Sequence, residues 1–302
     1  MKIPNVYFYP TAETDPDKLS PIARKVFERI ITEKKIELEK NPYLKIHPGE
    51  PGNITYTRPQ TYNGIIDCLQ EKGLTPSFIE TNTVTGKRTN KLSHLKVVKE
   101  HGFDRIPFIV ADGETGEDHI EMPVKKGRHF QTAKIAKILA GKNQVIVLSH
   151  FKGHIASGFG AAVKMLGIGF ASRRGKIIQH TREKYHSEPT INWSLFYRLH
   201  WGDKFIERVA DYALAASAGK KHIFLNFAIN LVKDCDCDAR PMEPLYPNLG
   251  IFASTDPVAI DKACMDQLQK RENKKPFKGE HVFGYAQEIG LGSAEYSLIE
   301  IA

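Results

Sequence analysis

Residues 144–180 read QVIVLSHFKGHIASGFGAAVKMLGIGFASRRGKIIQH, and this stretch bears most directly on the fold. Residues 144–148 are a β-branched, apolar run without alternation, which is typical of a strand buried on both faces. Glycine, histidine and lysine residues follow, and then apolar residues at helical spacing. A buried strand, a glycine-rich turn and a helix in this order form the repeating unit of a parallel α/β sheet.

The same alternation runs through the rest of the chain. Ser20 before Pro21 and Asp256 before Pro257 predict two helix starts. Strands are expected at residues 6–9, 43–46, 77–80, 107–111, 222–229, 249–253 and 296–301, and helices at 21–31, 59–72, 92–101, 132–139, 203–218, from 257 and at 282–289. We therefore predict an α/β fold of mostly parallel sheets covered by helices, with two lobes, 1–135 and 136–302, and a cleft between them.

Composition limits the function classes. The chain has 302 residues, is 41% hydrophobic and carries a formal charge of +8, which favours a small anionic ligand. The basic residues are dispersed, and no nucleic-acid-binding signature is present, so nucleic acid is not an expected partner. No apolar run reaches membrane-spanning length, the first residues lack a signal-peptide core, and the 4 cysteines are too few for a disulfide framework. A cytoplasmic protein without a membrane association is expected.

Polar residues directly after the predicted buried strand are the catalytic candidates. His150, Lys152 and His154 occupy the carboxyl end of a strand, where parallel α/β sheets collect their ligands. A helix expected from residue 157 or 158 to 165 carries Lys164, which adds a positive charge. Hydrogen bonding within the protein is the alternative role for the two histidines.

An anion site is predicted from glycines and cations around this turn. Gly153, Gly158 and Gly160 permit tight turns and a close approach of the backbone to a ligand. The start of the following helix would direct N–H groups at an anion. Lys45, at the end of an early strand, and Arg173 are further anion-binding candidates. The alternatives are a tight turn without a ligand and solvated loops.

A second polar loop suggests a metal. Residues 234–238 read DCDCD and follow another predicted strand. Thiolates and carboxylates can bind a transition metal, whereas a Cys-x-Cys pair is strained as a disulfide. The alternatives are an incidental polar loop and, for the aspartate before Pro257, a helix cap. The candidate metal ligands are His150, His154, His180, Cys235, Cys237 and Asp256.

Three stretches resemble the domain-of-unknown-function 362 family, also called uncharacterised Fe-S center proteins. The first is SHFKGH at 149–154 with GFGAAVKMLGIGFASRRGKIIQH at 158–180. The others are residues 234–264, which begin DCDCDARPMEPLYPNLG, and residues 281–301, HVFGYAQEIGLGSAEYSLIEI. KIHPGEPGNITYTRP at 45–59 is a weaker match, and the resemblance spans about residues 43–302.

The resemblance implies no settled activity. Many members carry a ferredoxin-like insert after the segment matching IIQH, but residues 181–221 contain no cysteine here. Four thiolates hold such a cluster, so no ferredoxin-type iron–sulfur cluster is expected. The family is also distantly similar to nickel-pincer lactate racemases, which combine His and Lys residues in a cleft between two α/β lobes.

These observations predict a metal-assisted enzyme that acts on a small anionic substrate bound at residues 149–180. The metal would be a divalent transition metal, with neither its identity nor the reaction class specified. The alternative is a non-catalytic electron-transfer or metal-centre accessory protein with a redox partner protein. Both hypotheses depend on whether residues 149–180 and the DCDCD loop are neighbours in space.

Overall fold

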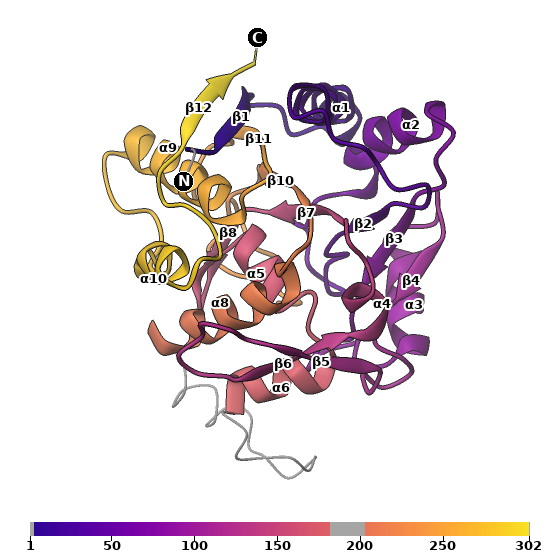
Figure 1. Cartoon of the computed structure of the whole chain (residues 1–302). Helices are drawn as coiled ribbons and strands as arrows, with labels where there is room; N and C mark the ends of the chain where they lie inside the picture. The colour runs from indigo at the N-terminus through magenta and orange to yellow at the C-terminus, as the bar shows by residue number, and fades with distance from the viewer. Residues whose placement is uncertain (1–2, 182–202, 302) are drawn as a thin grey trace.

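An eight-stranded sheet forms the centre of the protein. The computed structural model describes residues 3–181 and 203–301. The strand order is β12-β1-β11-β10-β7-β2-β3-β4 (Figure 1). The strands are β1 (Asn5–Pro10), β2 (Tyr43–Lys45), β3 (Ser77–Glu80), β4 (Phe108–Val110), β7 (Ile146–His150), β10 (Ile223–Ala228), β11 (Gly250–Ser254) and β12 (Ser297–Glu300). Segments 1–135 and 136–302 both contribute strands to this sheet.

The direction of the strands determines where polar side chains gather. The pairs β10–β7, β7–β2, β2–β3 and β3–β4 are parallel, whereas β11 is antiparallel to both β10 and β1. Every residue of β7 is buried, as predicted for the run at 144–148. The predicted α/β class with a mostly parallel sheet is confirmed. The carboxyl ends of β2, β3, β7 and β10 consequently meet at one edge.

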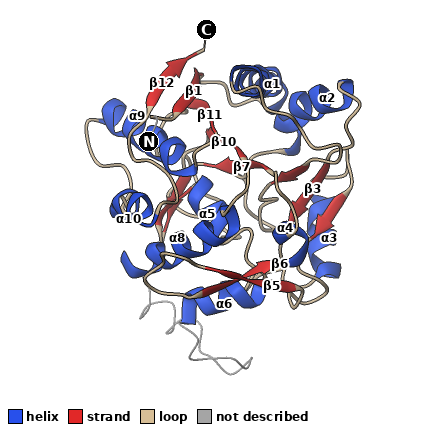
Figure 2. Cartoon of the chain, in the orientation of Figure 1, coloured by secondary structure: helices blue, strands red, loops and turns tan. Residues whose placement is uncertain are grey.

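Helices cover both faces of the sheet (Figure 2). Leu148 belongs to the core under α1 (Pro16–Glu33) and α2 (Asn63–Glu71). Val147 packs on the opposite face with α8 (Asp203–Ser217) and α9 (Pro257–Glu272). The remaining helices are η1 (Pro59–Tyr62), α3 (Lys91–Glu100), α4 (Lys137–Ala140), α5 (Ala162–Gly167), α6 (Arg173–Thr181) and α10 (His281–Ile289). None of the helices described is long and apolar enough to cross a membrane.

At the starts of α9 and α1, an aspartate followed by a proline determines where the helix begins. The Asp256 carboxylate accepts hydrogen bonds of 2.9 Å from the backbone N–H groups of Val258 and Ala259, so the predicted cap of α9 is confirmed. The predicted start of α1 at Ser20 is wrong, because Asp15 followed by a proline caps the helix one turn earlier. Pro21 is the sixth residue of α1, beyond the first turn, so the helix lacks the hydrogen bond that an N–H there would donate to the Asp17 carbonyl.

Two predicted helices differ in the structure. Residues 132–139 form β6 (Thr132–Ala136) and the short α4, because β6 pairs with β5 (His119–Pro123) and its side chains alternate between exposed and buried. The helix expected from residue 157 or 158 begins only at Ala162. The preceding glycines form β9 (Gly158–Gly160), which pairs with β8 (Lys152–His154). Strand pairing overrides the helical pattern at 132–136, whereas the glycines at 158 and 160 themselves disfavour a helix.

Candidate functional site

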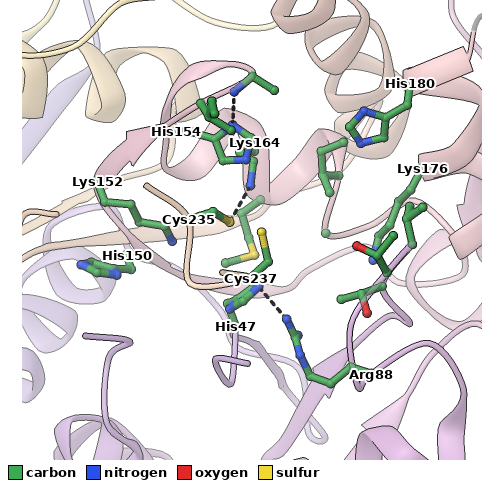
Figure 3. Close-up of a pocket in the computed structure, with 18 of the residues that line it drawn as sticks. His47, Arg88, His150, Lys152, His154, Lys164, Lys176, His180, Cys235 and Cys237 are labelled. Atoms are coloured by element: carbon green, nitrogen blue, oxygen red, sulfur yellow. Dashed lines mark hydrogen bonds between the residues drawn. The ribbon is translucent and has the colours of Figure 1, made fainter. Parts of the chain in front are cut away.

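A pocket of about 230 Å³ lies at the carboxyl edge of the parallel strands (Figure 3). Segments that follow β2, β3, β7 and β10 supply its polar lining, as expected for this class of sheet. The polar and charged residues that line it are His47, Glu80, Thr83, Thr85, Arg88, His150, Lys152, His154, Lys164, Lys176, His180, Cys235 and Cys237. The pocket therefore contains most of the predicted catalytic and metal-binding residues.

The segment after β7 and the DCDCD loop are neighbours. The Gly153 N–H donates to the Val232 carbonyl over 2.9 Å. The Ile155 N–H donates to the Asp234 carboxylate over 3.1 Å. Because β7 and β10 pair in parallel, the loops that follow them leave the sheet side by side. Residues 149–180 and the DCDCD loop are therefore neighbours in space, as both functional hypotheses require.

Three side chains in the pocket have the geometry of a metal site. A ring nitrogen of His154 and the Sγ atoms of Cys235 and Cys237 all lie within 4.8 Å of one another. Ligands bound to zinc at about 2.0–2.3 Å are about 3.5 Å apart, so small side-chain rotations would bring these three to one ion. Cys235 is buried, and Cys237 is exposed to the pocket. Three protein ligands would leave a fourth position open for a substrate.

The electrostatics of this triad prepare Cys235 and His154 for ligation, whereas the hydrogen bond to Cys235 and burial raise the pKa of the Cys237 thiol well above its ordinary value. A hydrogen bond from the Cys237 thiol lowers the pKa of Cys235 well below its ordinary value, against the effect of burial. Lys164 assists, with its Nζ 3.6 Å from the Cys235 Sγ. Burial and Lys164 lower the pKa of His154. A thiolate and a neutral imidazole are the protonation states that bind metals.

His150 and Lys152 converge on a buried carboxylate. The Asp236 side chain is fully buried, 3.0 Å from the His150 Nδ1 and 2.6 Å from the Lys152 Nζ. The His150 Nε2 donates to the Ile229 carbonyl over 2.7 Å. Although burial opposes it, the neighbouring His150 and Lys152 side chains hold the pKa of Asp236 far below its usual range. Both ring nitrogens of His150 thus face oxygen acceptors, and this cluster anchors the DCDCD loop to β7.

Three charged residues predicted for the site, and the three predicted glycines, do not line the pocket. Lys45 is fully buried and pairs with Glu80 over 2.7 Å. Arg173 donates from Nε to the Thr83 carbonyl over 3.1 Å and so supports the loop after β3. Asp256 caps α9. These placements fit structural roles for all three residues.

The predicted anion-binding glycines are points of close backbone packing. A Cβ on Gly153 would overlap the Lys233 carbonyl, and one on Gly158, which has φ +83°, would overlap the Lys278 carbonyl. A Cβ on Gly160 would lie 3.2 Å from the Lys164 side chain. The first two glycines therefore let the β8–β9 ribbon contact neighbouring loops.

Replacing Gly158 with alanine is expected to destabilise the fold strongly. The left-handed conformation costs about 1–2 kcal/mol for a residue with a side chain. The overlap with the Lys278 carbonyl adds about 1–3 kcal/mol. Gly73→Ala is the matched control, since Gly73 has φ +74° and no neighbour within 4 Å of an added Cβ. Urea unfolding measures both variants, and equal losses would show that packing at Gly158 is unimportant.

Two further residues on the α6 side of the pocket carry shifted pKa values. Lys176 donates to the Oγ1 of Thr81 and the carbonyl of Asn82, each over 2.7 Å, and burial lowers its pKa to about 8. His180 stacks on Phe205, with 4.6 Å between ring centroids, and burial lowers its pKa to about 3. His180 is thus neutral at pH 7, as metal ligation requires, but it is not part of the triad.

Arg88 is a pocket residue that the sequence analysis missed. Its Nε contacts the Glu50 carboxylate over 3.0 Å, and its Nη2 lies 3.2 Å from the His47 Nε2 (Figure 3). A usable signal existed, because TNTVTGKRTN at 81–90 follows β3 at the same edge of the sheet. No spacing motif marks this loop, and only the fold brings it to the pocket.

A family model described as a domain of unknown function (DUF362) matches residues 43–266. The chain is similar to a crystal structure of a Thermotoga maritima protein, with 14% identity over 87% of this chain and 61% of that chain and a TM-score of 0.49. It is similar to the lactate racemase apoprotein from Thermoanaerobacterium thermosaccharolyticum, with 13% identity over 86% of this chain and 56% of that chain and a TM-score of 0.44. No curated protein matches.

The chain therefore spans less than two thirds of the length of either solved structure. At these TM-scores, neither structural similarity gives information about the chemistry of the pocket. The residues of the site must be interpreted from their own geometry.

Proposed function

The chain belongs to the DUF362 family, and from this premise we propose that it is a metal-assisted enzyme whose small anionic substrate binds in the pocket beside residues 149–180. The observation that carries the proposal is the grouping of one imidazole and two thiols within 4.8 Å in a pocket lined by cations. Sulfur and nitrogen ligands of this kind select a divalent transition metal over magnesium or calcium.

Each group has a distinct task in this proposal. His154, Cys235 and Cys237 hold the metal, which supplies Lewis acidity when bound. Lys164 lies beside the Cys235 sulfur, where its charge offsets that of the thiolate. Lys176 adds positive charge on the opposite wall and attracts an anion. Apolar residues complete the wall and limit access of water, which strengthens these electrostatic interactions.

The protein purified without oxygen is expected to bind one equivalent of a divalent transition metal. Elemental analysis measures the metal, and titration of the chelator-treated protein with Co²⁺ should give a thiolate-to-metal absorption band. His154→Ala should weaken Co²⁺ binding by about 100-fold or more, since even the loss of a supporting contact to a ligand costs about 10–100-fold. His129→Ala is the control, because His129 pairs with Glu207 and does not line the pocket. A protein that takes up no metal in either experiment would refute the proposal.

A further inference from the structure

Arg88, which lines the pocket, has a hydrogen-bonding group without a partner in the described part of the chain. Its side chain is fully buried, and two of its three guanidinium nitrogens contact Glu50 and His47. The third, Nη1, is buried without a hydrogen-bond partner in the described part of the chain. Leaving a buried charged donor unpaired is unfavourable, so such groups usually have a partner. Arg88 lines the pocket, and a bound ligand would provide that partner.

A second unpaired group lies on the same loop. The Thr83 Oγ1 is buried and has no partner among the residues described, and Thr83 also lines the pocket. The Thr83 N–H donates to the Arg88 carbonyl over 2.8 Å, so the two residues are held in one turn. The Glu50 carboxylate accepts from the Arg88 Nε and from the Lys87 N–H, which fixes this turn against the segment after β2. Among the described residues, the loop thus holds an unpartnered guanidinium nitrogen and an unpartnered hydroxyl, each on a residue that lines the pocket.

The surroundings define the ligand further. Within residues 3–181 and 203–301, the Lys176 ammonium donates to neutral oxygens, Thr81 Oγ1 and the carbonyls of Thr81 and Asn82, and the Glu80 and Asp112 carboxylates act on it without a direct hydrogen bond. Val84, Met165, Ile168 and Phe205 form an apolar part of the wall. The volume of about 230 Å³ is below that of typical drug-sized pockets, which are about 300–1,000 Å³. These features fit a small ligand with one anionic end and a short apolar body.

We propose that Arg88 Nη1 and Thr83 Oγ1 form the subsite for the carboxylate of a small monocarboxylic acid whose apolar body lies against Met165 and Ile168. This inference rests on the proposed function, because it names the substrate class of that pocket. A carboxylate suits the subsite better than a phosphate, since one guanidinium nitrogen and one hydroxyl match two oxygens and a single charge. Lys176 contributes charge at a distance.

Butyrate is a suitable probe, with butyramide as its neutral counterpart and inorganic phosphate as the competing anion. Calorimetric titration of the full chain after chelator treatment should show saturable binding of butyrate, with butyramide and phosphate at least 10-fold weaker. Arg88→Lys keeps the charge beside Glu50 but removes Nη1, and it should weaken butyrate about 10- to 100-fold. Lys87→Gln is the control on the same loop, because the Lys87 side chain is exposed, and it should bind butyrate like the wild type.

Thr83→Val is a second test of the subsite, in case the Arg88→Lys variant does not fold. It removes only the hydroxyl, and several-fold weaker binding of butyrate supports the subsite even if Arg88→Lys does not fold. The inference is overturned if butyrate does not bind, if butyramide or phosphate binds as tightly, or if both variants bind butyrate like the wild type. Metal content is measured separately. If the protein binds butyrate but no metal, only the proposed metal-assisted function fails. If it binds metal but not butyrate, only the carboxylate subsite fails.

Discussion

Asp236→Asn is expected to lower the free energy of unfolding at pH 7 by about 3–5 kcal/mol, the usual cost of removing one partner from a buried ion pair. The carboxylate is fully buried between His150 and Lys152, and asparagine keeps its shape without its charge. Lys152 would then retain a buried charge without a compensating anion. Urea unfolding of the variant and the wild type measures the difference.

The effect should depend on pH in a defined direction. The folded-state pKa of Asp236 is far below the unfolded value of about 3.9, so its contribution is complete above that value and decreases as the pH falls below it. The difference between variant and wild type should therefore shrink below about pH 4. Asp238→Asn is the control on the same loop, because its partner Arg240 is exposed and such pairs contribute about 0–1 kcal/mol. Equal effects of the two substitutions would contradict the buried network.

The double substitution Cys235→Ser/Cys237→Ser is expected to abolish tight metal binding. It removes two of the three ligand atoms that lie within 4.8 Å of one another. Hydroxyl groups are poor substitutes for thiolates toward soft metals, and the affinity should fall on the order of a thousandfold or more. Competition with a chromophoric chelator under anaerobic conditions measures the change in dissociation constant.

Cys68→Ala provides the matched control for this experiment. Cys68 is a buried free cysteine on α2, in the core between the sheet and helices α1 and α2. It does not line the pocket. Its replacement should leave metal affinity unchanged. A double variant that binds metal as tightly as the wild type would move the metal site elsewhere in the protein.

The sequence supports the prediction of elements whose signals are local. The run at 144–148 identifies β7 because a strand buried on both faces shows a nearly continuous apolar run instead of alternation. Asp256 before Pro257 identifies the start of α9 because capping involves only adjacent residues. β5 and β6 were missed because each is stabilised by the other, and Thr132–Ala136 taken alone has no clear strand signal.

The residues of the site likewise fall into those predicted from local sequence and those placed only by long-range contacts. His154, Cys235 and Cys237 were predicted from residue chemistry at the ends of strands, a rule that follows from the parallel sheet. Arg88 was missed because its position depends on Glu50 and on the pairing of β3 with β2, which a single loop does not reveal. Asp236 and His150 form their contact across long sequence separation, so their shared burial could be seen only in the folded chain.

The pairing of β7 with β10 has a consequence for the order in which the protein is built. Cys235 and Cys237 are sequence neighbours, so their thiols are close together even in the unfolded chain. His154 reaches them only after residue 146 has paired with residue 223, a contact that requires closure of a long loop. Parallel sheets with such distant pairings fold slowly. Bringing His154 to the two thiols therefore requires the long-range pairing of β7 with β10, whereas the approach of the thiols to each other does not.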